Sequence, residues 1–119
     1  RMSIQELGTI MEQQAPVKVV LLNKNYLGNV RQWQDMFFNH RKSFTKMLNP
    51  HYATICKGYA IPYDVVTERE ALRGAVEKMA AATGPYVLEV AIKEEDNVLP
   101  MTPPGNSVDE MLLELDLNN

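Results

Sequence analysis

The sequence predicts an α/β fold, a three-layer sandwich fragment in which helices cover both faces of a mostly parallel sheet. Three short runs rich in valine, leucine and isoleucine have the length of strands, and segments with helical spacing of apolar residues separate them. Continuous apolar character, without alternation, is typical of parallel strands covered on both sides. We therefore expect right-handed crossovers in which a helix connects each pair of parallel strands.

The first half of the chain is expected to hold two helices around one strand. Ser3 to Glu6 match a capping box, which predicts a helix start at Ser3, and Pro16 prevents that helix from continuing. The following run is almost wholly apolar, so we expect a strand buried on both faces. The expected elements are a helix from Ser3 to about Gln14, a strand from Val17 to Leu22, a helix from Leu27 to Phe38 and a polar loop from His40 to Leu48.

The second half is expected to hold two further strands. Asn49 followed by Pro50 predicts a helix start, and Thr67 to Glu70 match a second capping box. Pro62 has no amide donor and therefore favours a bulge or an edge position in its strand. The expected elements are a short helix through Cys56 to Tyr59, a strand from Ile61 to Val66, a helix ended by Gly84 and Pro85, a strand from Tyr86 to Ile92, an acidic turn from Glu94 to Asp96, an extended loop from Pro100 to Gly105 and a short helix starting at Ser107.

Composition excludes several classes of function. The chain has 119 residues and a formal net charge of −3 without a basic cluster, so a nucleic-acid partner is not expected. Cys56 is the only cysteine, which rules out an internal disulfide and suits the cytoplasm. The sequence shows no membrane-length apolar run. Arg31 is expected on a solvated face, and His40 and His51 lack the spacing of metal ligands.

Open sheet edges suggest that residues 1–119 are the C-terminal portion of a larger domain. Three apolar strands alone would leave both edges and much apolar surface uncovered, so we expect the partner strands to lie before Arg1. On this interpretation the upstream domains are absent from the chain, and the chain should associate with copies of itself.

The turn from Asn23 to Gly28 is the candidate site, because open α/β sheets bind ligands beyond the carboxyl ends of their strands. Short amides and free carbonyls can present oxygens to a hard cation, and a helix N-terminus can present amide donors to a phosphate. The same residues are also favoured in ordinary strand-to-helix turns for local reasons. The residues alone leave both interpretations open.

Two separate stretches of the sequence resemble one family. Leu22 to Phe38 is similar to the segment of acetolactate synthase large subunits that closes the thiamine-diphosphate motif and continues into the active-site helix. Asn97 to Gly105, followed by Asp109 to Leu112, resembles the C-terminus of the same family. The order and spacing of the two stretches agree, and the resemblance covers nearly the whole chain.

The resemblance implies a transferase that decarboxylates pyruvate on thiamine diphosphate and adds the two-carbon unit to a second 2-oxo acid, in branched-chain amino acid biosynthesis. The cofactors would be thiamine diphosphate and magnesium, with FAD in the intact enzyme. The partners would be the upstream domains, other copies of the chain and a regulatory small subunit. The catalytic glutamate is absent, so this chain alone should be inactive. A non-catalytic assembly module and another thiamine carboligase are the alternatives.

The resemblance also implies the roles of individual residues. The second asparagine of the family's motif is a metal ligand, and that position is Lys24, which has no lone pair to offer while charged. Two roles for Lys24 stay open, a solvated turn residue and a cation that neutralises a diphosphate oxygen. Asn29 replaces a family methionine. Trp33 would line the substrate channel, although helical spacing alone favours a core aromatic. The implied metal ligands are the Tyr26 carbonyl and Asn25, and the implied cofactor-binding residues are Asn23, Asn25, Tyr26, Leu27, Gly28, Asn29 and Val30.

Overall fold

The computed structural model describes residues 2–94 and 97–113. Over this range the chain forms two compact units. The first unit contains the residues up to Asn23 and Asn49–Ile92, and the second contains Lys24–Leu48 and the tail from Lys93. No helix in this part of the chain has the length and apolar composition that a membrane span requires.

A three-stranded parallel sheet forms the centre of the first unit. Its strands are β1 (Lys18–Asn23), β2 (Tyr63–Val66) and β3 (Tyr86–Ala91), in the order β1-β3-β2. β2 is an edge strand, as Pro62 predicted, and the Pro62 carbonyl accepts the Val87 amide at 2.9 Å. The predicted strands and their parallel arrangement are confirmed.

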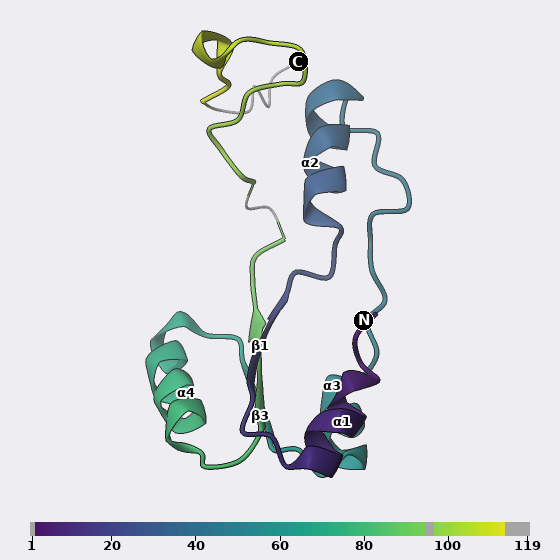
Figure 1. Cartoon of the computed structure of the whole chain (residues 1–119). Helices are drawn as coiled ribbons and strands as arrows, with labels where there is room; N and C mark the ends of the chain where they lie inside the picture. Colours follow the sequence, from purple (N-terminus) through teal and green to yellow (C-terminus); the bar gives the residue numbers. More distant parts are fainter. Residues whose placement is uncertain (1, 95–96, 114–119) are drawn as a thin grey trace. The chain divides into compact units, whose positions relative to one another are not determined.

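Helices cover both faces of this sheet, so the predicted three-layer arrangement is confirmed. The helix α4 (Arg69–Ala81) lies on one face, and α1 (Glu6–Gln13) and α3 (Tyr52–Gly58) lie on the other (Figure 1). Successive side chains of β3 point to opposite faces of the sheet and therefore pack against both helical layers. Leu88 is fully buried in the cluster beneath α4, and Val87 belongs to the cluster beneath α1 and α3.

The prediction that the first strand is buried on both faces was wrong. Val20 and Leu22 in β1 are 49% and 64% exposed. These side chains point to the α4 face of the sheet, but α4 packs against β2 and β3. Central burial belongs instead to β3, whose first three residues are all buried.

Three helices begin one or two residues later than their predicted caps indicate. α1 begins at Glu6, because backbone hydrogen bonds such as Glu6 N to Ser3 O form a turn that precedes the helix. α3 begins at Tyr52, two residues after Pro50. α4 begins at Arg69 without a side-chain cap. Capping residues identified the right regions, and the first helical residue differs from the prediction by only one or two positions.

The second unit is built around α2 (Gly28–Phe37), which agrees with the predicted helix. Gln32 on this helix is only 4% exposed, and its amide holds the tail segment through a pair of 2.9 Å hydrogen bonds with the backbone of Val98. The predicted final helix is the single 3₁₀ turn η1 (Val108–Glu110), where the Glu110 carboxylate accepts the Ser107 amide at 3.2 Å. Most of the predicted acidic turn lies outside the described residues.

The uncovered edge of β1 leads to a prediction about self-association. We expect the chain to form oligomers at micromolar concentration, because Val20 and Leu22 present apolar surface beside the open edge of the strand. Sedimentation velocity measures this directly. Replacing both side chains by lysine should shift the population toward monomer, and a clean monomer before substitution would contradict the prediction.

The ion pair between Lys78 and Asp64 on the α4 face leads to a second prediction, which concerns stability in acid. Hydrogen bonds from the Lys78 ammonium at 2.6 Å and the Tyr86 hydroxyl at 2.5 Å lower the pKa of Asp64 below its ordinary 3.8. A lowered pKa adds stability that is present above about pH 4 and is lost as the pH falls through the folded-state value. In Asp64→Asn, the free energy of unfolding measured with urea should therefore fall less steeply as the pH drops below about 4. The same dependence on pH in both proteins would contradict this.

Candidate functional site

A network of polar side chains surrounds Asn23 at the carboxyl end of β1. The Asn23 amide nitrogen donates to Glu89 Oε1 at 2.7 Å, and the Asn23 amide oxygen accepts from Asn49 Nδ2 at 2.8 Å. The Tyr63 hydroxyl donates to Glu89 Oε2 at 2.5 Å, and the Tyr52 hydroxyl donates to Asn49 Oδ1 at 3.4 Å. Both ends of the Asn23 amide are thus hydrogen-bonded within the first unit.

Glu89 affects the protonation of its neighbours. Burial and then the hydrogen bond to Glu89 raise the pKa of Tyr63 well above its ordinary value of 10.0. Burial, followed by the charge of Glu89, also raises the pKa of Cys56. Tyr63 therefore remains a hydrogen-bond donor at neutral pH, and the Cys56 thiol is a poor nucleophile.

In the second unit, an antiparallel pairing follows the turn. The Met47 amide donates to Asn25 O at 2.8 Å, and the Leu27 amide donates to Thr45 O at 2.9 Å, so Tyr26 and Lys46 form a pair without mutual hydrogen bonds. In such a pair, the carbonyl of each residue points away from the opposite strand. The Tyr26 carbonyl therefore has the direction that a ligand to an external cation needs.

Asn25 has a left-handed backbone with φ of 58°. Asparagine tolerates this conformation better than most residues that have a side chain. Turn geometry therefore gives a reason for asparagine at this position that does not involve a metal. The metal-ligand role implied for Asn25 remains a prediction.

The side chain of Lys24 folds back over the first residue of α2. A Cβ atom added to Gly28 would lie 3.5 Å from Lys24 Cδ and 3.7 Å from Lys24 Nζ. The ammonium group thus lies beside the amino end of α2, where the helix dipole favours an anion over a cation.

One face of α2 presents apolar side chains to the surface. Val30, Trp33 and Phe37 are each more than 40% exposed, and the rings of Trp33 and Phe37 meet edge to face at 5.5 Å. Leu27 and Asn29, which flank the first turn, are exposed as well. The interpretation of Trp33 as a core aromatic is therefore wrong for the described part of the chain, whereas the channel role stays a prediction.

Arg31 does not lie on a simple solvated face, contrary to expectation. Its guanidinium stacks over the Tyr26 ring at 4.4 Å and donates to the carbonyl of Glu94 at 2.9 Å. Glu94 is 63 residues away in sequence, and Tyr26 lies outside α2, so helical periodicity could not reveal either partner. Arg31 fixes the Tyr26 ring and, with Gln32, connects α2 to the tail.

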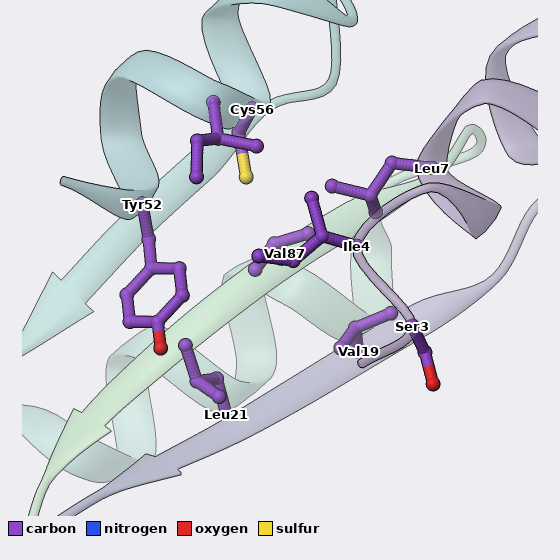
Figure 2. A pocket seen from close by; sticks show the side chains of 9 residues that line it. Ser3, Ile4, Leu7, Val19, Leu21, Tyr52, Cys56 and Val87 are labelled. Atoms are coloured by element: carbon purple, nitrogen blue, oxygen red, sulfur yellow. The ribbon is translucent and has the colours of Figure 1, made fainter. Parts of the chain in front are cut away.

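An apolar cavity of about 180 Å³ lies between α1, α3 and the sheet in the first unit. Figure 2 shows Tyr52 and Cys56 from α3 facing Leu21 and Val87 across it. Few polar atoms reach this cavity, so it lacks the donors that a phosphate group would require. The lining residues are Ser3, Ile4, Leu7, Val19, Leu21, Tyr52, Ile55, Cys56 and Val87.

Comparison with known proteins identifies the family. Residues 1–90 match the family model described as thiamine pyrophosphate enzyme, C-terminal TPP binding domain. The chain belongs to this family. It is 42% identical over 96% of its length to the acetolactate synthase isozyme 2 large subunit of Escherichia coli. It is 38% identical over 97% of its length to the chloroplastic acetolactate synthase 1 of Oryza sativa. The chain spans 21% and 19% of these two relatives.

The turn of this thiamine pyrophosphate family member offers few ligands to a metal-bound cofactor. The described residues contain no group of three or more His, Cys, Asp or Glu side chains that could hold a metal. The outward carbonyl of Tyr26 fits the role of one oxygen ligand, whereas the charged ammonium of Lys24 cannot serve as another. The turn of this family member therefore fits a metal-bound diphosphate only in part.

Glu89 and Asn49 belong to the polar network but were not predicted as site residues. Glu89 interrupts the apolar run of β3, which is an unusual place for a carboxylate and was an available signal. Asn49 was interpreted as a helix cap, but its side chain binds Asn23 instead. Their partners lie 66 and 26 residues away in sequence, beyond any local pattern.

Proposed function

We propose that this chain forms part of the thiamine-diphosphate site of an acetolactate synthase. The observation that carries the proposal is the identity of 42% over 96% of the chain with a large subunit of that enzyme, which includes the turn at the carboxyl end of β1. The reaction would be the decarboxylation of pyruvate and the transfer of the two-carbon unit to a second 2-oxo acid. Acetolactate synthase is a transferase of branched-chain amino acid biosynthesis.

The proposed roles of the chain's own groups are binding and orientation. The Tyr26 carbonyl would coordinate magnesium, with Asn25 as the candidate side-chain ligand. The backbone from Leu27 to Val30 at the start of α2 would face the diphosphate, and Trp33 would line the route of the substrate. The cofactor, when bound, supplies the stabilised carbanion on which carboligation depends.

The proposal includes the partners of a complete enzyme. These are the upstream domains with their catalytic glutamate and FAD, further copies of the chain, a regulatory small subunit and the 2-oxo acid substrates. The proposed location is the cytoplasm. The chain's length, about a fifth of its relatives, is consistent with its needing these other parts.

A second candidate function is a non-catalytic assembly module that keeps the fold without cofactor binding. The position of the Lys24 ammonium beside the amino end of α2 favours it, because a cation there opposes a magnesium ion. A chimera separates the two candidates. The Escherichia coli relative would carry this chain in place of its matching segment, and acetolactate formation from pyruvate would be measured. Product formation supports the synthase, and a folded but inactive chimera supports the module.

Cofactor binding by the chain alone gives a third prediction. We expect titration calorimetry with magnesium and thiamine diphosphate to show no saturation below about 1 mM, because one carbonyl and one candidate amide are too few ligands for the metal. The titration without magnesium serves as the control. Micromolar, magnesium-dependent binding would mean that the turn contains further ligands.

A further inference from the structure

Asn23 and Asn49 mark the two ends of the segment Lys24–Leu48. Asn23 is the last residue before this segment and Asn49 the first residue after it, and their side-chain amides are hydrogen-bonded at 2.8 Å. Inside the segment, Asn25 pairs with Met47, and Leu27 pairs with Thr45, in the same sequence register. The amide pair therefore joins the two residues that flank the segment, in the same sequence register as the backbone pairs inside it.

The orientation of the Asn23 amide is fixed by complementary partners. Its nitrogen donates to the Glu89 carboxylate, which only accepts, and its oxygen accepts from the Asn49 amide nitrogen. A flipped Asn23 amide would place oxygen against oxygen and nitrogen against nitrogen. Tyr63 and Tyr52 hold Glu89 and Asn49 in turn.

The Glu89 carboxylate loses solvation at its position in the sheet, and its hydrogen bonds must offset that cost. In the sheet it lies in register between Leu21 on β1 and Val65 on β2, both apolar. A carboxylate among apolar neighbours loses solvation that only good donors can replace. Asn23 and Tyr63 supply two such donors, so the side chain links β2 and β3 to the end of β1.

We propose that Asn23, Asn49 and Glu89 form a clamp that holds the two ends of segment 24–48 at the carboxyl end of β1, so that Asn23 positions the cofactor turn and is not a cofactor ligand. The inference deepens the proposed function, and it rests on that function only for what the turn binds. The clamp itself consists of contacts within the first unit.

The test measures hydrogen exchange of the Leu27 and Met47 amides by NMR, in this chain without cofactor. These amides close the ladder within the segment. Asn49→Ala removes the amide pair and should speed the exchange of both amides about fivefold. Asn23→Asp places two carboxylates against each other and should speed it about tenfold or more. Asp64→Asn, which weakens a similar network on the opposite face, is the matched control and should leave these amides unchanged.

A double substitution distinguishes a clamp from general destabilisation. In Asn23→Asp with Glu89→Gln, the glutamine amide can donate to the new carboxylate, so the bond between positions 23 and 89 is restored with reversed polarity. The Tyr63 hydroxyl still donates to residue 89 and the Asn49 amide still donates to residue 23. We expect exchange to return to within about threefold of the original chain. Equal exchange in Asn23→Asp and the double variant, or unchanged exchange in Asn49→Ala, would overturn the clamp. Cofactor is absent throughout, so failure here does not depend on the proposed function.

Discussion

Replacing Lys24 by asparagine should tighten magnesium-dependent binding of thiamine diphosphate by more than about tenfold, or about 1.4 kcal/mol. An amide oxygen would then replace an ammonium group that repels the metal across a few ångströms. Removing the lysine also withdraws a cation that lies beside the amino end of α2. The measurement is a pair of cofactor titrations on the Escherichia coli chimera, one with Lys24 and one with Lys24→Asn.

The matched control for this experiment is Asn25→Gly in the restored chimera. Glycine keeps the positive φ of this position while it removes the side-chain amide, so the turn is preserved and only the candidate ligand is lost. Little change in affinity is expected if position 24 is the ligand. Equal affinities of the chimeras with Lys24 and with Lys24→Asn, together with a loss of binding in Asn25→Gly, would identify Asn25 as the ligand.

Shortening Leu88 to alanine should destabilise the chain by about 3 kcal/mol. Leu88 is 0% exposed at the centre of β3, between two paired strands and beneath α4, so the surroundings cannot easily close the cavity that is left. Urea unfolding followed by circular dichroism measures the change.

Val65→Ala on β2 provides the comparison for that core substitution. Val65 is 55% exposed, so the loss of its methyl groups should cost well under 1 kcal/mol by the usual area dependence. A Leu88→Ala variant as stable as Val65→Ala would show that β3 does not carry the core of the first unit.

The fold could be predicted largely because its signals are local. Three apolar runs and the intervening helical stripes are visible within windows of a few residues, and these elements appeared nearly where expected. The burial of β1 could not be predicted in the same way. Val20 and Leu22 have the composition of core residues, but their exposure depends on where α4 lies, which is a tertiary property.

The candidate site was predictable only in outline. The strand-to-helix turn at Asn23 follows from the general position of ligands in α/β sheets, and the start of α2 at Gly28 agreed with it. The partners of Asn23 could not be foreseen, since hydrogen bonds between residues 66 positions apart leave no spacing to detect. The stacking of Arg31 on Tyr26 was missed although both are close in sequence, because it depends on the turn geometry between them.

The buried amide of Gln32 sets a limit on how far the chain can be trimmed. Its oxygen and nitrogen are both used by the backbone of Val98, and Met101 Sδ lies 3.3 Å from the same nitrogen. A polypeptide that stops before Val98 would remove these partners from a side chain that is only 4% exposed. The tail is thus a part of the packing of α2, and shortened versions intended for crystallisation or binding assays should retain it through Leu112, which pairs with Met101.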